Sequence, residues 1–315
     1  MSNKIGLVIK TAGNLYTILT PDNLKIHCKL TGKYRLEGLK STNPVVVGDR
    51  VEYACDDNDQ FGRIVDVKER KNYIIRKSSN LSKTHQVIAA NLDLLLLMAT
   101  IEYPKTYAEF IDRYLVTAEA YNIPVIILFN KTDLYSQKHL HTMEEWSRMY
   151  QEIGYRCMAI TAIDKKSVEA LNSILKDKVT LIAGNSGVGK STLINTLDPT
   201  LQPVIKEISD YHKKGKHTTT FVEMYSLSSG GFIIDSPGIK GFGLIDMEDE
   251  PLFHYFPEFF DISKECKFNN CIHINEPGCA VLEALENGKI SQLRYKSYIS
   301  LLNEQEGSQK YRDKF

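Results

Sequence analysis

The sequence of 315 residues has no net charge and no long hydrophobic run. Basic and acidic residues each number 39, which argues against a nucleic-acid binder that is basic throughout and against an acidic tail protein. The longest apolar runs, residues 94–99 and 124–129, fall far short of the roughly 18 residues that a membrane helix needs. The N-terminus shows no apolar stretch of signal-peptide length. We therefore expect a cytoplasmic protein with no membrane partner.

What is present is typical of a globular protein. Hydrophobic residues make up 43% and charged residues 25%, which excludes general disorder. At about 150 residues per domain, the length favours two domains and allows three. Of the six cysteines, Cys28, Cys55 and Cys157 are scattered and are typical of small buried apolar residues. The other three fall in one short segment and need a different explanation.

The first 75 residues favour a small β-barrel. Short runs rich in β-branched and aromatic residues, separated by turn formers, predict five strands: 5–9, 15–19, 25–28, 45–53 and 62–67. Five short strands in this length suggest the oligonucleotide-binding (OB) type of barrel. A small barrel with no role in nucleic-acid binding is the alternative. Residues 76–80 are interpreted as a polar linker.

The rest of the chain changes in character twice. Residues 76–246 alternate predicted strands (92–100, 125–129, 156–161, 179–183) with predicted helices (108–121, 143–152, 168–176 and one that opens at Lys190). Such alternation indicates parallel βαβ units. Residues 247–315 are acidic and aromatic, contain the cysteine cluster, and end in a predicted helix over 290–303. The fold class is thus a multidomain chain: an all-β domain, an α/β domain and a mostly helical C-terminal domain.

The most specific motif is a phosphate loop. A strand-like run leads into Gly, four residues, Gly-Lys-Ser, and a helix-like run follows. Backbone N–H groups of such a loop converge on phosphate oxygens, the lysine reaches the β- and γ-phosphates, and the serine hydroxyl binds Mg²⁺. This context disfavours an accidental glycine-rich turn. The candidate nucleotide-binding residues are Gly184, Asn185, Ser186, Gly187, Val188, Gly189, Lys190, Ser191 and Thr192.

A second phosphate-side element follows 45 residues after Lys190. Asp235 ends a hydrophobic strand and precedes Ser-Pro-Gly238. Such an aspartate orients Mg²⁺, and the N–H of Gly238 is placed to sense a γ-phosphate. Without a phosphate loop, a strand that ends in an Asp-rich turn would be the better interpretation.

A third element is suited to a guanine base. Asp133 in the run Asn130, Lys131, Thr132, Asp133 can accept hydrogen bonds from N1 and N2 of guanine, and adenine cannot supply that donor pair. Thr161 and Ala162, at the end of the next strand, would suit a backbone N–H to guanine O6. A polar strand-end loop is the plainer alternative for both segments.

The segment 215–220 has the features of a switch loop. A threonine there can bind Mg²⁺ when the γ-phosphate is present. Among Thr218, Thr219 and Thr220 the residues do not decide, and Thr219 is favoured. Ile239 occupies the place where many nucleotide hydrolases carry a water-orienting glutamine, and its side chain cannot bind water. His217 is the nearest group that could position water; an ordinary polar role is equally open for it.

Three cysteines and a histidine form a complete tetrahedral donor set within 14 residues. Cys266, Cys271, His273 and Cys279 have the Cys₃His composition of structural zinc sites. Disulfides are disfavoured by the expected compartment. Four protein ligands leave no open position, so we expect one structural Zn²⁺ rather than a catalytic metal.

The nucleotide motifs together resemble those of the Ras-type GTPase superfamily, in an unusual order. The base-reading segments precede the phosphate loop, and Asp235 comes last, which is the order of a circularly permuted domain. Permutation is tolerated where the old termini lie close together.

The whole chain resembles the ribosome small-subunit-dependent GTPase A family (RsgA/YjeQ), through the barrel, the permuted motifs, the run Gly215-Lys-His-Thr-Thr-Thr220 and the cysteine cluster. The resemblance implies an OB-like RNA-binding barrel (1–75), a circularly permuted P-loop GTPase domain (76–246) and a zinc-binding C-terminal domain (247–315). It further implies a monomeric factor for late maturation of the small (30S) ribosomal subunit, which binds its rRNA and hydrolyses GTP to GDP when stimulated by the subunit. It also implies a catalytic role for His217.

Two other functions stay open from the residues themselves. One is an RNA-binding scaffold whose nucleotide site is mainly structural, and the other is a GTPase that serves a different partner. The charge distribution bears on RNA binding, because residues 1–82 hold 14 basic and 9 acidic side chains. This modest excess lies where a phosphate backbone would be met.

Overall fold

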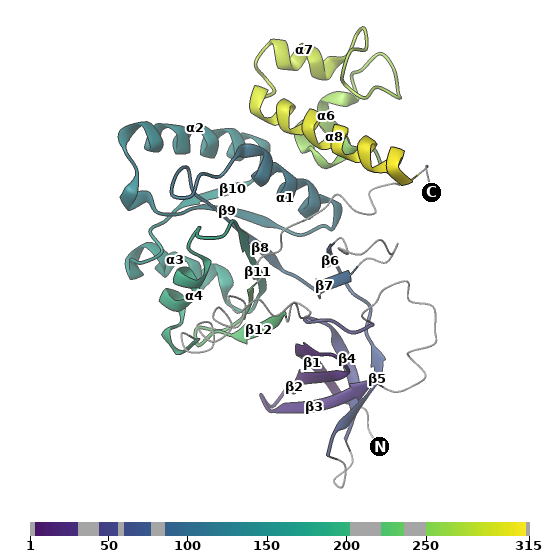
Figure 1. Ribbon diagram of the computed structural model, residues 1–315, viewed down its shortest axis with the longest axis vertical. Coiled ribbons are helices and arrows are strands. Elements are labelled where there is room, and N and C mark those ends of the chain that lie inside the picture. Colours follow the sequence, from purple (N-terminus) through teal and green to yellow (C-terminus); the bar gives the residue numbers. More distant parts are fainter. Residues whose placement is uncertain are drawn as a thin grey trace.

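The computed structural model describes residues 4–30, 44–55, 60–76, 86–201, 222–235 and 250–312. Figure 1 shows three parts in sequence order: a barrel, a central sheet flanked by helices, and a helical C-terminal part that lies beyond α1 and α2. In the described part of the chain, no helix is both long enough and apolar enough to cross a membrane.

The N-terminal part is a closed five-stranded barrel. Its strands run in the order β1-β2-β3-β5-β4, and β4 pairs back onto β1. Among the barrel strands that the structure describes, β3 and β5 form the one parallel pair. One face of the barrel wall is apolar and fully buried, as alternation along the strands requires, so the prediction of an OB-like barrel is confirmed. The strands are β1 (Lys4–Ala12), β2 (Leu15–Leu19), β3 (Lys25–Leu30), β4 (Arg50–Ala54) and β5 (Gly62–Val67).

Two local predictions in this region were wrong. The strand expected over 45–53 begins only at Arg50. The three valines before it are buried in three different apolar clusters rather than in a strand. Val45 packs in the barrel, Val46 beside a small hairpin and Val47 in the central domain. That hairpin, β6 (Tyr73–Arg76) with β7 (Gln86–Ala90), was not predicted. Arg76 belongs to β6 rather than to a linker, and residues 77–80 lie outside the described ranges.

The central part is a six-stranded sheet with helices on both faces. The order is β10-β9-β8-β11-β13-β12, and β12 continues into β1 of the barrel, so that the described strands of the two parts form one 11-stranded sheet. Within the central part five strands are parallel and β12 is antiparallel. The strands are β8 (Leu94–Ala99), β9 (Val125–Phe129), β10 (Arg156–Ala159), β11 (Val179–Gly184), β12 (Glu223–Ser226) and β13 (Phe232–Asp235). The predicted α/β alternation is therefore confirmed.

Alternate residues of the central strands face different helices. Leu95 and Leu97 of β8 pack with α1 (Ala108–Ala120) and α2 (Gln137–Ile153). Leu94 and Leu96 pack on the other face, with α3 (Lys165–Leu175) and α4 (Lys190–Leu197). Because both faces are covered, the strands are nearly uniform apolar runs. Two short 3₁₀ helices, η2 (Thr132–Leu134) and η3 (Pro199–Leu201), complete this part.

Helix α2 begins six residues before its predicted start. Ser136 caps it, accepting a hydrogen bond from the His139 N–H at 3.4 Å. Its first turns are mostly polar and exposed, so the apolar periodicity that sequence analysis relies on starts only at Met143. The cap, rather than the pattern, determines where the helix begins.

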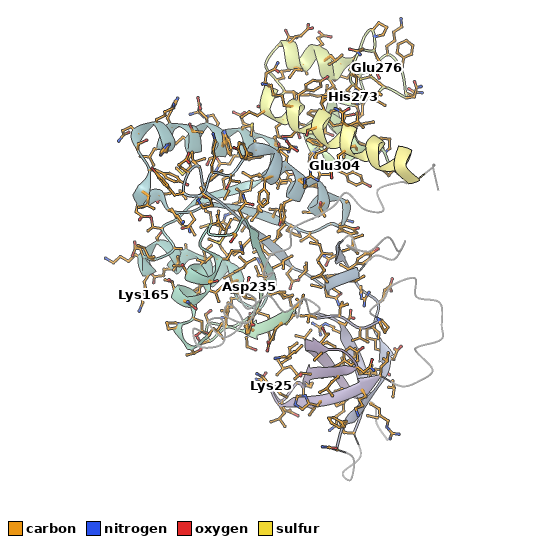
Figure 2. All side chains as sticks on the ribbon, viewed as in Figure 1. Lys25, Lys165, Asp235, His273, Glu276 and Glu304 are labelled. Carbon is orange, nitrogen blue, oxygen red and sulfur yellow. The ribbon has the colours of Figure 1, made fainter. Side chains whose placement is uncertain are left out.

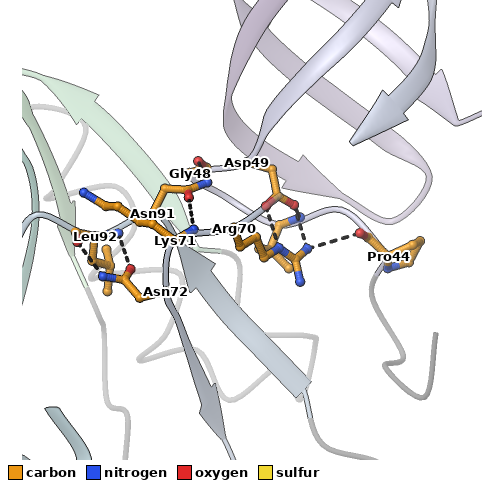
Figure 3. Close-up of polar contacts among 9 residues, drawn as sticks. Pro44, Gly48, Asp49, Arg70, Lys71, Asn72, Asn91 and Leu92 are labelled. Atoms are coloured by element: carbon orange, nitrogen blue, oxygen red, sulfur yellow. Dashed lines mark hydrogen bonds and ion pairs between the residues drawn. The ribbon is translucent and has the colours of Figure 1, made fainter. Parts of the chain in front are cut away.

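The barrel and the central sheet are joined by pairing and by polar contacts. Strand β1 pairs with β12, where Lys10 lies 3.0 Å from the Glu223 carboxylate. Figure 3 shows the second junction. There Arg70 donates two hydrogen bonds of 2.7 Å to the buried carboxylate of Asp49, and Asn72 bonds both backbone groups of Leu92.

The C-terminal part consists of η4 (Leu252–Tyr255), α6 (Pro257–Ser263), α7 (Ala280–Glu286) and α8 (Gln292–Arg312). Its apolar core includes Phe256, Phe259 and Tyr298, and Val116 of α1 joins that core from the central domain. The expectation of a mostly helical domain is confirmed; the last helix extends beyond the predicted 290–303.

Candidate nucleotide site and metal centre

The phosphate loop lies between β11 and the first turn of α4. Gly184, Gly187 and Gly189 have positive φ angles of 147°, 79° and 105°. A side chain at Gly184 would meet the Met98 carbonyl oxygen, and one at Gly189 would meet the Asn130 amide, each at 2.4 Å. Glycine is therefore required at both positions by backbone conformation and by close packing.

The lysine of the loop is folded over it. The Lys190 ammonium donates to the carbonyl oxygens of Gly184 and Asn185 at 2.8 and 3.0 Å. Burial lowers the pKa of Lys190, and the charge of Asp235 opposes this shift. Ser186, Ser191 and Thr192 are exposed, whereas Val188 is buried beneath the loop. The loop thus presents hydroxyl groups at the positive end of a helix.

The Asn130 side chain is hydrogen-bonded both to the phosphate loop and to the second predicted base-side segment, Thr161 and Ala162. We call this pair of contacts the Asn130 bridge. The Asn130 amide N–H donates to the Val188 carbonyl at 2.8 Å, and its amide oxygen accepts the Ala162 N–H at 2.9 Å. Asn130 is almost fully buried. The structure therefore brings together three segments that are up to 58 residues apart in sequence.

The other residues predicted to contact the base also form contacts within the protein. Lys131, in a left-handed conformation, donates to the carbonyl oxygens of Tyr103 and Gly187. The hydroxyls of Thr132 and Thr161 lie 2.9 Å apart. Asp133 is exposed on η2 and accepts no hydrogen bond within the described ranges. Its carboxylate is therefore placed to accept from a ligand.

The two N–H groups expected near guanine O6 are used inside the protein. The Thr161 N–H donates to the Ser167 hydroxyl at 2.8 Å and the Ala162 N–H to Asn130. These bonds fix the segment beside the base-reading loop. The role of Ser167 as the acceptor for the Thr161 N–H was not predicted, because Ser167 belongs to no sequence motif.

Tyr135 and Tyr103 were also missed. The Tyr135 hydroxyl donates to the Asn130 carbonyl at 2.7 Å and accepts the Ile101 N–H at 2.8 Å. Tyr103 contributes only its carbonyl group to Lys131. Backbone contacts of this kind carry no sequence signal, so neither residue could be identified from a motif.

Asp235 ends β13, directly beside β11. Its register partner is Ile182, two residues before the loop begins. Figure 2 shows Asp235 in the central domain, far from His273 and Glu276 in the C-terminal part. The other predicted phosphate-side residues, His217, Thr219 and Gly238, and also Ile239, lie outside the described residues.

The predicted metal ligands converge in the C-terminal part. The donor atoms of Cys266, Cys271, His273 and Cys279 all lie within 4.8 Å of one another. His273 Nδ1 is 3.7 Å from the Cys266 sulfur and 3.4 Å from the Cys279 sulfur. A tetrahedral zinc with ordinary bond lengths separates nitrogen and sulfur ligands by about 3.5 Å. The donor set therefore fits zinc. Burial lowers the pKa of His273, which favours the neutral imidazole that binds metals.

Hydrogen bonds from residues outside the donor set hold the loops around these ligands. The Glu276 carboxylate accepts the N–H groups of Ile272, Ile274 and Asn275 at 2.7 to 3.0 Å. The hydroxyls of Tyr295 and Tyr298 on α8 donate to the carbonyl oxygens of His273 and Ile272. The fold thus orients the histidine through its backbone.

Comparison with known families decides the classification. The RsgA GTPase family matches residues 67–245, and the RsgA N-terminal domain matches residues 5–64. The chain belongs to the RsgA GTPase family. A small ribosomal subunit biogenesis GTPase RsgA of Bacteroides fragilis is 52% identical over 307 residues, which is 98% of each chain. One from Flavobacterium psychrophilum is 50% identical over 94% of this chain and 92% of its own.

Two solved structures share this architecture. YjeQ from Thermotoga maritima superimposes with a TM-score of 0.79 at 35% identity, covering 96% of this chain and 98% of its own. YloQ, described as a circularly permuted GTPase, superimposes with a TM-score of 0.74 at 30% identity, covering 96% and 95%. The circularly permuted fold expected from the motif order is therefore confirmed.

Proposed function

We propose that this chain hydrolyses GTP and acts in late maturation of the small ribosomal subunit. The observation that carries the proposal is the Asn130 bridge, which holds a phosphate loop and a base-reading loop together at the carboxyl ends of β11 and β9, the two strands that flank β8. Nucleotides bind at this edge in open α/β sheets. The names of the curated relatives support the ribosomal partner, and that partner would place the chain in the cytoplasm.

In this proposal each end of the nucleotide has its own residues. Residues 184–192 receive the phosphates through backbone N–H groups, and Lys190 turns from the loop carbonyls toward the β- and γ-phosphates. Asp133 accepts from N1 and N2 of guanine, and the stem of Lys131 lies along the base. Thr132, Thr161 and Ala162 hold that loop. Gly238 is proposed to sense the γ-phosphate.

Hydrolysis needs a cation and an oriented water molecule. Ser191, Thr219 and Asp235 are the proposed Mg²⁺ ligands; hydroxyl and carboxylate oxygens are the donors Mg²⁺ takes, and it would neutralise phosphate charge. Ile239 cannot bind water, so His217 is proposed to position it. Turnover by the isolated protein should then be slow, because this machinery depends on the subunit.

The C-terminal metal is proposed to be structural Zn²⁺, and the chain is proposed to act as a monomer in three domains, 1–75, 76–246 and 247–315. The barrel, with its excess of basic residues, is proposed to contact rRNA.

The base assignment is tested by exchanging the acceptor for a donor. Asp133→Asn should weaken GTP binding and strengthen binding of xanthosine triphosphate, whose C2 carbonyl accepts where guanine donates. Fluorescent nucleotide titration measures both affinities, with ATP as a third ligand. Asn303→Asp on α8, an exposed position, is the control. Unchanged preference for GTP in Asp133→Asn would refute the assignment.

A further inference from the structure

A row of charged residues crosses the sheet from the barrel to the nucleotide site. Figure 1 shows β12 between the central sheet and the barrel. Glu223, the first residue of β12, has two register partners: Lys10 of β1 on one side and Asp235 of β13 on the other. Asp235 in turn lies opposite Ile182 of β11, two residues before the phosphate loop. Lys10, Glu223 and Asp235 therefore stand side by side, and we call them the charged row.

A β-bulge in β1 sets the direction of Lys10. The pairing of β1 with β2 shifts between Val8 and Lys10, so that Ile9 is an extra residue in β1. Such bulges re-aim the side chains beside them. The Lys10 ammonium lies 3.0 Å from the Glu223 carboxylate, whereas Ile9 is buried in the central apolar cluster that also contains Val222. The two strands thus share one charged contact and one apolar contact.

Glu223 and Asp235 place two carboxylates next to each other. Residues directly opposite in an antiparallel pair share a face of the sheet, with Cβ atoms about 5 Å apart, and like charges in such a pair repel each other. Lys10 offsets this repulsion from the barrel side. The Lys10 and Glu223 side chains are 43% and 25% exposed, so water weakens these interactions without cancelling them.

A cation held at Asp235 would be affected by both other charges of the row. The Glu223 carboxylate attracts such a cation, and the Lys10 ammonium repels it. Coupling between two binding events is reciprocal. An ammonium that weakens the binding of a cation is therefore itself bound less tightly once the cation is present.

We propose that Lys10 and Glu223 link the Mg²⁺ affinity of the nucleotide site to the attachment of the barrel. Glu223 raises that affinity, Lys10 lowers it, and bound Mg²⁺ weakens the contact between β1 and β12. Both are positioning residues, which act on a cation at Asp235 without binding it. The inference rests on the proposed function for the presence of Mg²⁺ at Asp235. A purely structural salt bridge predicts a different result, because loss of either partner would then impair the site in the same direction.

The barrel contains a matched control for Lys10. Lys68 follows β5 and pairs with the carboxylates of Glu52 and Asp66, and its side chain is 38% exposed. Glu52 lies opposite Ile5, at the other end of β1 from Lys10. Lys10→Met and Lys68→Met thus each remove one paired ammonium from the barrel, but Lys68 is not part of the charged row.

The experiment titrates Mg²⁺ into the full-length protein bound to fluorescent GDP, without a chelator. Glu223→Gln should raise the Mg²⁺ concentration at the midpoint by about 2-fold to 5-fold, and Lys10→Met should lower it by a similar factor, which is the range for partly exposed charges. Lys68→Met should titrate like the unmodified chain. The double variant of Lys10→Met and Glu223→Gln should lie between the two single variants.

Hydrogen exchange of residues 8–12 measures the reciprocal effect on the barrel. In the unmodified chain with GDP, added Mg²⁺ should speed the exchange of these amides by the same factor of about 2 to 5, because coupling has the same size in both directions. In Lys10→Met with GDP, added Mg²⁺ should leave their exchange unchanged. This second measurement does not depend on catalysis.

The proposal would be overturned by unchanged midpoints, by shifts in the same direction for Glu223→Gln and Lys10→Met, or by an equal shift in Lys68→Met. Exchange of residues 8–12 that does not respond to Mg²⁺ in the unmodified chain would also overturn it. These results leave the proposed function intact if Mg²⁺ alters GDP binding. GDP binding that is insensitive to Mg²⁺ would contradict both, and absence of GTP turnover would contradict the proposed function alone.

Discussion

The Arg294 guanidinium donates a 2.7 Å hydrogen bond to the Asp112 carboxylate, and both side chains are completely buried. Arg294 belongs to α8 and Asp112 to α1, so this ion pair joins the C-terminal and central parts. Glu258 accepts two further bonds from Arg294, and the Tyr150 hydroxyl donates to Asp112. Burial raises the pKa of Asp112, against the attraction of Arg294. Each charge is thus tolerated only while its partners are present.

Removal of Arg294 should therefore be costly. Arg294→Met leaves the buried Asp112 carboxylate and the partly buried Glu258 carboxylate without their cation, and we expect a loss of about 3–5 kcal/mol in the free energy of unfolding. Urea denaturation measures it. Adding Asp112→Asn and Glu258→Gln should recover part of the loss, because the two charges that lost their partner are removed as well.

The control is a more exposed pair on the same helices. Arg113 of α1 bonds Glu304 of α8, whose side chain is 51% exposed, and Arg113→Met should cost less than about 1 kcal/mol. Equal losses for the two arginine variants would contradict the importance assigned to burial.

The Asn130 bridge predicts a defect in nucleotide binding. Asn130→Asp keeps the acceptor for the Ala162 N–H but replaces the donor to the Val188 carbonyl with a second oxygen. An unsatisfied buried group costs about 1–3 kcal/mol, so GDP affinity should fall by roughly 5-fold to 150-fold. Fluorescent GDP titration checks this, and wild-type affinity in the variant would show that the bridge does not organise the site.

The metal centre predicts local dependence on zinc. Cys279→Ser, or treatment with a strong chelator, should release one zinc per chain and unfold the C-terminal part, because metal binding supplies folding free energy in such sites. The barrel shares no ligand with this centre and should retain its structure. Metal analysis and hydrogen exchange together report both effects; a C-terminal part that stays protected without zinc would contradict the structural role.

The pKa of Asp198 predicts part of the acid sensitivity. Burial alone would raise the pKa of Asp198, but hydrogen bonds from Ser228 and Thr200 outweigh burial and bring it below its ordinary value. A carboxylate whose folded pKa is depressed stabilises the fold above its unfolded pKa of about 3.9, and this contribution is lost as pH falls through the folded value.

Asp198→Asn should accordingly lower the free energy of unfolding at pH 7 and flatten its decline below about pH 4. The contributions of other carboxylates cancel in the difference between the two proteins. Urea denaturation at several pH values measures that difference, and parallel stability curves would show that Asp198 contributes nothing to acid denaturation.

Sequence reasoning succeeded where chemistry is local. The phosphate loop could be predicted because glycine, lysine and serine must stand at fixed spacing around one turn, and the Cys₃His cluster, which could hold a metal ion, because its four residues lie within a single short segment. The long apolar strands of the central sheet were predicted for the same reason, since burial on both faces leaves its mark on every residue.

Sequence reasoning failed where a contact joins distant segments. Nothing around Arg294 indicates that it is the buried partner of Asp112, and nothing in Val45–Val47 reveals that each residue packs in a different cluster. The pairing of β1 with β12 was equally inaccessible, because the residues of a strand do not specify which distant strand pairs with it. The role of Asn130 as a bridge depends on the fold rather than on its motif.

The central claim is that this chain is a GTPase that responds to the small ribosomal subunit. The measurement is the rate of phosphate release from GTP and from ATP, by the purified protein alone and with small or large ribosomal subunits added. The account predicts slow release from GTP alone, a large increase with small subunits only, and little release from ATP. Equal rates with and without small subunits, or equal use of ATP, would contradict it.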